Sequence, residues 1–108
     1  MIGYSYEQEG SSMKKRVFEN SWGGHGEHGF RYYDYSVSQN SITIYITVKD
    51  FNDWGGKSTF QSNYVKEISF PINNHEITKE FLFDCIIKAG KELNETYLLP
   101  KVPGDLKL

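Results

Sequence analysis

The sequence contains a single cysteine, Cys85, and this scarcity excludes two kinds of covalent or metal-based support. One thiol cannot form a disulfide within the chain, and it cannot supply a zinc site built from several cysteines. Cys85 lies among apolar residues at helical spacing, so we expect a buried structural thiol rather than a nucleophile. A chain of 108 residues can hold one core without such support, and we expect a single domain over residues 1–108.

Long apolar runs are also missing. No stretch approaches the roughly 18 apolar residues that a membrane span needs, and the longest candidate, residues 81–87, is interrupted by Asp84. The first residues are polar, and no apolar run follows the basic residues 14–16, which argues against a signal peptide. We therefore expect a cytoplasmic protein that does not enter membranes.

Arginine is scarce, and the charges are unevenly placed. Only two of the twelve basic residues are Arg, the net charge is −2, and no basic run exceeds three residues. Nucleic-acid binders need a basic face, commonly with Arg, so we expect no nucleic-acid binding. Residues 19–56 instead hold five carboxylates against two cations, a local balance of −3.

Aromatic and β-branched residues are abundant, and they predict a β-hairpin. Residues 31–38 and 41–48 alternate in polarity and flank the dipeptide Gln39-Asn40. A two-residue turn fixes the register, so that the numbers of opposite residues sum to 79. We expect the apolar face to be buried, with Tyr33, Tyr35, Val37, Ile42, Ile44 and Ile46. We expect the other face to be more exposed, with Tyr32, Asp34, Ser36, Thr43 and Thr47.

Further strands are predicted on both sides of this hairpin. Residues 63–72 alternate and contain Pro71, which cannot donate to a ladder and therefore indicates an edge strand. Weaker candidates lie at residues 2–9 and 14–21, with a turn at 10–12 between them. The strands are thus expected within residues 2–72.

The hydrophobic period changes after residue 72 and predicts a helix over about 75–93. Asn73 and Glu76 fit a capping box at its start. Residues 94–108 contain two prolines and are expected to form a tail. The helix stripe comprises Ile77, Phe81, Leu82, Cys85, Ile86, Ala89 and Leu93. The order of elements favours an α+β fold: an antiparallel sheet of about four to five strands with one long C-terminal helix packed on one face.

Two motifs suggest ligand chemistry without meeting its requirements. The stretch SWGGHGEHGF, residues 21–30, offers His25 and His28 as metal ligands, but its glycines prevent the helix on which such ligands are usually held. We expect a Gly-rich loop with solvent-exposed imidazoles, no metal and no cofactor. The Gly-Lys-Ser of DWGGKSTF resembles the end of a phosphate-binding loop, but Phe51 occupies the position of the required glycine.

No catalytic motif is evident, so we expect a protein-binding function rather than an enzyme. Tyr and Trp beside carboxylates make a plausible contact surface for a basic protein partner. The candidate contact residues are Trp22, Glu27, Tyr32, Asp34, Tyr45, Asp50, Asp53 and Trp54.

The gross character of the chain resembles that of immunity proteins of bacterial toxin systems, which are small, slightly acidic and free of catalytic motifs. The favoured interpretation is therefore an immunity-type inhibitor that neutralises a toxin domain by direct binding. Two alternatives stay open. One is a phage or accessory protein that binds another protein, and the other is a small enzyme or ligand-binding domain that uses residues 21–30.

Overall fold

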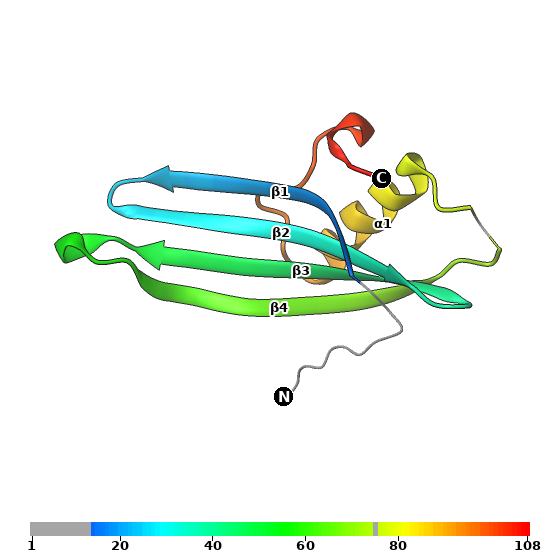
Figure 1. Ribbon diagram of the computed structural model, residues 1–108, viewed down its shortest axis with the longest axis horizontal. Helices are drawn as coiled ribbons and strands as arrows, with labels where there is room; N and C mark the ends of the chain where they lie inside the picture. Colours follow the sequence, from blue (N-terminus) through cyan, green and yellow to red (C-terminus); the bar gives the residue numbers. More distant parts are fainter. Residues whose placement is uncertain (1–13, 75) are drawn as a thin grey trace.

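The computed structural model describes residues 14–74 and 76–108, in which four antiparallel strands are followed by one α-helix (Figure 1). The strands lie in the order β1-β2-β3-β4 across the sheet, so each is paired with its neighbour in the chain. The α+β prediction is confirmed at this level, while the candidate strand at residues 2–9 lies outside the described residues. The elements are β1 (Lys15–Gly24), β2 (Glu27–Val37), β3 (Ser41–Asn52), the 3-10 helix η2 (Trp54–Gly56), β4 (Thr59–Pro71), α1 (Lys79–Glu92) and the 3-10 helix η3 (Pro103–Asp105).

The β2–β3 hairpin has the register that its hydrophobic pattern predicts. Val37 lies opposite Ile42, and the pairing continues without a shift to Glu27 opposite Asn52. Alternate residues of the two strands therefore share a face, and the apolar set joins the core that α1 covers. The buried members of this set are Tyr33, Tyr35, Ile42, Ile44, Ile46 and Val48.

Three residues of the hairpin depart from the predicted burial. Val37 is 41% exposed, because it is the last residue of β2 and lies outside the core cluster. Asp34 and Ser36 are buried although they lie on the opposite face. Arg16 Nε donates to Asp34 Oδ1 at 2.6 Å, and the Ser36 and Tyr45 hydroxyl groups are 3.1 Å apart, so long side chains from β1 and β3 cover both. The other polar-face residues are half-buried, as expected: Tyr32, Thr43 and Thr47.

The Gly-rich stretch at residues 21–30 forms a second hairpin, so the prediction of a loop is wrong. β1 continues to Gly24 and β2 begins at Glu27, which leaves only His25 and Gly26 in the turn. Both turn residues have positive φ, 54° and 76°, the backbone that matches the right-handed twist of paired strands. Glycine adopts this conformation without steric cost, so the hairpin extends both strands beyond the predicted segments.

The outer strands extend the predicted ones. β1 covers most of the weak candidate at residues 14–21, and β4 takes in nearly all of residues 63–72 together with much of the segment before it. β4 is an edge strand that ends at Pro71, as predicted. Lys66 is a charged residue of β4 opposite the buried Ile46, and its Nζ lies 2.8 Å from Glu95 Oε2.

The helix begins later than the predicted 75–93, and its cap is a different residue. Asn73 has a φ of 45° and belongs to the turn after β4, so the proposed capping box with Glu76 does not start the helix. Thr78 caps α1 instead, and its Oγ1 accepts a hydrogen bond from the Phe81 N–H at 3.1 Å. The chain has to reverse direction after β4 before a helix can lie on the sheet, and Asn73 and Asn74, both with positive φ, form the turn that begins this reversal.

In the middle of α1, the buried residues belong to the predicted apolar stripe. Leu82, Cys85, Ile86 and Ala89 are buried in the core cluster, whereas Phe81 is half-buried at its edge. Burial raises the pKa of the Cys85 thiol, as it does for a thiol without an activating base. The predicted burial of Cys85 is thus confirmed.

The chain after α1 packs on the same face of the sheet as the helix. Leu106 is buried in the core, and the Lys107 N–H donates to the Val17 carbonyl at 2.9 Å, which attaches this segment to β1. Further along the sheet, the Tyr97 ring meets the Trp22 ring edge-on at 6.4 Å. The tail therefore covers part of the sheet that α1 does not reach.

An ion pair beneath Tyr97 fixes this part of the sheet. Arg31 Nη1 donates to Asp50 Oδ1 at 2.7 Å, and Trp22 Nε1 donates to the same oxygen at 3.0 Å. The Arg31 side chain is 9% exposed, so the pair is largely withdrawn from water. Any side chain at Gly29 would collide with Trp22 and Asp50, which explains why glycine is needed on this strand.

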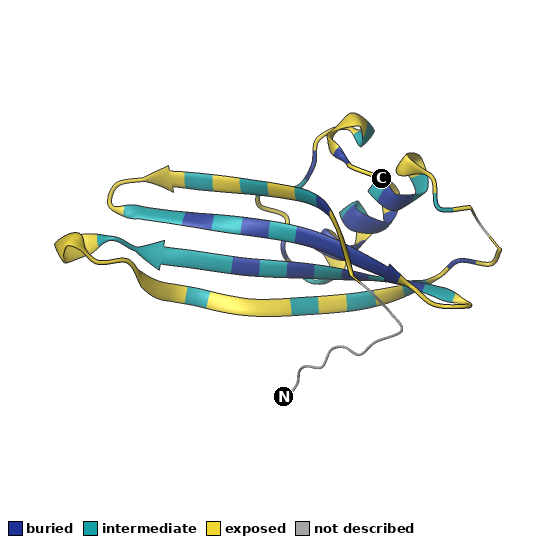
Figure 2. Ribbon diagram, viewed as in Figure 1, coloured by how far each residue is buried: buried dark blue, intermediate teal, exposed yellow. Residues whose placement is uncertain are grey.

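The helix is much shorter than the strands that it covers. Its 14 residues span about 21 Å, at about 1.5 Å per residue, and the 13 residues of β4 span roughly 43 Å. Figure 2 shows the buried residues of β2 and β3 gathered near α1, with half-buried and exposed residues toward the far ends of the strands. These far ends, formed by the β1–β2 turn and η2, are termed the tip of the sheet.

Replacing Leu82 by Ala should lower the free energy of unfolding by about 2–5 kcal/mol, because its side chain is fully buried. Phe81→Ala should lower it by less, since Phe81 keeps part of its surface in water. Urea denaturation of both variants measures the difference. Val37→Ala serves as a control with a loss below about 1 kcal/mol, and a loss at Val37 equal to that at Leu82 would contradict this description of the core.

Candidate functional site

The face of the sheet turned away from α1, termed the open face, carries a row of ring side chains. β2 places three rings on this face at alternate positions, and the register adds one ring from β3 and one from β4. Phe51 lies directly opposite His28, and Phe60 lies directly opposite Phe51. The aromatic row comprises His28, Phe30, Tyr32, Phe51 and Phe60.

The rings of this row contact one another across the strands. The His28 ring is stacked on Phe51 with centroids 4.7 Å apart, and Phe60 follows at 4.7 Å from Phe51. Cross-strand pairs of this kind contribute about 0.2–1 kcal/mol each, so the row supports the tip in place of a covering layer. Phe60 is nevertheless 56% exposed, which leaves ring surface available for contact.

A polar cluster joins the row to the tip. His28 Nδ1 lies 2.7 Å from Asp53 Oδ2, and the Ser58 hydroxyl donates to Asp53 Oδ1 at 2.6 Å. His28 is half-buried, so the prediction of a solvent-exposed imidazole is wrong for this residue, while His25 in the turn is exposed. In a hydrolytic triad the hydroxyl bonds the histidine, whereas here both groups bond the carboxylate. The arrangement fits a structural clasp between β2 and the segment after β3.

Trp54 occupies the outermost position of the tip and is 68% exposed. The Asp53 N–H donates to the Gly26 carbonyl at 2.8 Å, which joins the β1–β2 turn to the segment that holds Trp54. A side chain at Gly26 would press against the indole ring of Trp54. The two Trp-Gly-Gly segments thus end at neighbouring turns, and the segment after the second one is a strand rather than the helix of a phosphate-binding loop.

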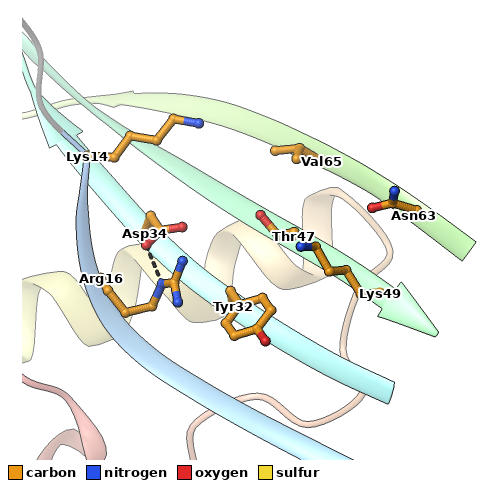
Figure 3. Close-up of a pocket in the computed structure, with 8 residues that line it drawn as sticks. All are labelled: Lys14, Arg16, Tyr32, Asp34, Thr47, Lys49, Asn63 and Val65. Atoms are coloured by element: carbon orange, nitrogen blue, oxygen red, sulfur yellow. Dashed lines mark hydrogen bonds and ion pairs between the residues drawn. The ribbon is translucent and has the colours of Figure 1, made fainter. Parts of the chain in front are cut away.

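A shallow groove of about 690 Å³ adjoins the aromatic row on the open face (Figure 3). It crosses all four strands, and Tyr32 belongs both to the groove and to the row. Figure 3 shows Arg16 turned toward Asp34, with Lys14, the residue before β1, and Lys49 of β3 also at the groove. The lining residues are Lys14, Arg16, Tyr32, Asp34, Thr47, Lys49, Asn63 and Val65.

The residues predicted to contact a partner do not form one patch. Tyr32, Asp34 and Tyr45 lie on the open face, although Asp34 is buried beneath Arg16. Trp22 and Asp50 lie on the α1 face and bond each other there. The remaining three lie at or beside the tip: Glu27, Asp53 and Trp54.

Most of the carboxylates of residues 19–56 are paired within the fold. Four of the five have a basic partner: Glu19 and Asp34 with Arg16, Asp50 with Arg31, and Asp53 with His28. Glu27 instead accepts a hydrogen bond from Gln61 Nε2 at 3.2 Å. The local balance of −3 is therefore spread over both faces and the tip, and it does not gather into one acidic surface.

Sequence reasoning missed several residues of the open face: Phe30, Phe51, Phe60, Arg16 and Lys49. The sequence does contain a signal for the ring residues of β2, because rings alternate at positions 28, 30 and 32. This alternation is recognised only if the strand is taken to start before residue 30. Phe51 would then follow from the sum of 79 that the hairpin already supplied. Phe60 depends on the β3–β4 register, which shifts between Asp50 and Phe51 and has no sequence signal.

No protein-family model matches the chain, and no curated protein or solved structure matches it either. Within residues 14–74 and 76–108, no group of three or more His, Cys, Asp or Glu side chains is placed to hold a metal ion. No helix of this described part is long and apolar enough to cross a membrane.

The Asp53 carboxyl should titrate below its ordinary pKa of 3.8, mainly because the Ser58 hydroxyl bonds its charged form and because His28 adds a second bond. The bonded form exists only in the folded chain, so Asp53 contributes stability above the ordinary pKa. This contribution is lost as the pH falls through the lowered pKa of the folded state. Carbon-13 NMR of the carboxyl group measures the midpoint, which Ser58→Ala should raise. A midpoint that Ser58→Ala leaves unchanged would contradict the clasp.

Proposed function

We propose that this chain is a protein-binding domain that contacts its partner through the open face and the tip. The proposal rests on the aromatic row, because exposed ring side chains on a sheet face that no described element covers are typical of protein contact surfaces. Trp54 and Phe60 are the most exposed rings of this region, at 68% and 56%. Aromatic side chains of this kind supply much of the affinity in protein interfaces.

The charges of the open face favour a protein over a nucleic acid. Among the described strand residues of this face and Lys14 beside them, three cations stand against three carboxylates: Lys14, Arg16 and Lys49 against Glu19, Asp34 and Glu67. Binding to a phosphate backbone requires a net basic face. A face with balanced charges and aromatic rings supports contact with a protein surface of mixed polarity.

The proposed activity is that of an immunity-type inhibitor, which acts by covering a toxin domain and needs no reacting group. The expectation of a basic partner is supported only at the tip, where Glu27 and Asp53 lie beside Trp54. The other three carboxylates of residues 19–56 are already paired with Arg16 or Arg31. The aromatic surface therefore supplies most of the proposed binding free energy, and acidic charge supplies less.

A photo-crosslinking phenylalanine analogue at position 60 should capture the partner from a lysate of the source organism, whereas the same analogue at position 102 should not. Phe60 lies on the open face, and Val102 is equally exposed but lies on the segment after α1. Mass spectrometry identifies the captured protein, which is then purified for binding measurements.

Trp54→Ala and Phe60→Ser should each raise the dissociation constant for that partner about tenfold or more, as expected for exposed aromatic contacts. Val102→Ser should leave the dissociation constant unchanged, and thermal unfolding should be similar for all three variants. Binding that is insensitive to both ring replacements, or that is lost in Val102→Ser, would place the interface on another surface and overturn the proposal.

A further inference from the structure

We propose that the groove on the open face binds the carboxylate of an acidic side chain of the protein partner, with an apolar neighbour of that side chain on Val65 and Tyr32. This inference rests on the proposed protein-binding function and names the chemistry that one part of the interface recognises. The local charge balance of residues 19–56 predicts a basic partner, whereas this groove would accept an acidic side chain of the partner.

The groove holds more positive charge than the rest of the open face. Its lining contains three cations and one carboxylate, Asp34. Arg16 Nε donates to Asp34 at 2.6 Å, so this carboxylate already has a cationic partner and is buried. The groove therefore keeps the charges of Lys14 and Lys49 for a ligand.

Neither ammonium group has a carboxylate partner within the part of the chain that the structure describes. Lys14 Nζ lies 4.2 Å from the centre of the Tyr45 ring, and Lys49 Nζ lies 5.9 Å from the centre of the Tyr32 ring. Contacts with ring faces hold the two lysine side chains at the groove without neutralising their charge. Figure 3 shows both lysines among the side chains that line the groove.

The other lining residues fit a polypeptide better than a free anion. Val65 is 52% exposed and offers an aliphatic wall, while Thr47 and Asn63 offer hydrogen-bonding groups. An anion held only by exposed lysines stays hydrated and gains little. Because the groove and the aromatic row share Tyr32, a protein that covers the row can place one carboxylate in the groove at little further entropic cost.

The first test uses defined peptides and proton–nitrogen NMR of the full chain. The probe is a capped Leu-Glu-Leu peptide, and its matched control is Leu-Gln-Leu. The glutamate peptide should shift the amide signals of the groove residues with a dissociation constant of about 1–10 mM, as one exposed ion pair with a small apolar contact allows. The double variant Lys14→Gln, Lys49→Gln should lose these shifts, and Lys101→Gln, an exposed lysine on the segment after α1, should keep them.

Three results would overturn the assignment. The glutamine peptide could shift the same amides equally, the double lysine variant could bind as the unaltered chain does, or a short oligothymidylate could shift the groove residues at lower concentration than the peptide. The last result would indicate a single-stranded nucleic acid in place of a protein carboxylate.

The second test separates this inference from the proposed function. Against the partner captured at position 60, the double lysine variant should bind at least threefold more weakly, and the deficit should shrink as salt screens the lost charges. If Trp54→Ala and Phe60→Ser weaken binding while the double lysine variant binds normally at low salt, the groove assignment fails and the protein-binding function stands. If the aromatic variants also bind normally, the proposed function fails as well.

Discussion

The mismatch in length between one helix and a long sheet determines the rest of this structure. α1 has 14 residues at a rise of about 1.5 Å each, whereas β3 and β4 have 12 and 13 residues at about 3.3 Å each. The helix therefore covers only part of one face. The tail after α1 extends that cover with Tyr97 and Leu106. Within the described residues no second layer packs on the other face, and its side chains have to be compatible both with water and with an ordered sheet.

Two ion pairs and the aromatic row allow the sheet to extend beyond its core. Arg31 with Asp50, and Lys66 with Glu95, place charges on the α1 face where an apolar core ends and the tail begins. The side chains of Arg31 and Asp50 are 9% and 17% exposed, so removing one of them would leave the other charge with little water, which is far more unfavourable than the pair itself. The rings of the open face also stabilise the sheet beyond its core, because each ring covers part of the apolar surface of its cross-strand neighbour. The tip is thus held by side chains that also remain reachable from solvent.

Sequence reasoning recovered those features that depend on local periodicity. The register of β2 and β3 followed from alternation and a two-residue turn, and the stripe of α1 followed from its period. The hairpin at His25-Gly26 was missed because glycines on both sides of a turn look like a loop when pairing is unknown. The burial of Asp34 and the pairing of the acidic residues depend on Arg16 and Arg31, which approach from other positions in the sheet. A local charge balance therefore described the composition of residues 19–56 but not the surface that they form.

Tyr32 connects the two parts of the open face that carry the functional argument. Its ring lies 6.0 Å from Phe30 in the aromatic row and 4.4 Å from the Arg16 guanidinium in the groove. The strand alternation of β2 produces this position, because residues 30, 32 and 34 follow one another on the same face as a ring, a ring and a carboxylate. Arg16 neutralises the carboxylate and stacks on the ring at the same time, so the apolar row passes into a cationic groove within one strand. Under the proposed protein-binding function, a partner that covers Tyr32 would therefore meet both surfaces, and the sheet would select it by shape and charge together.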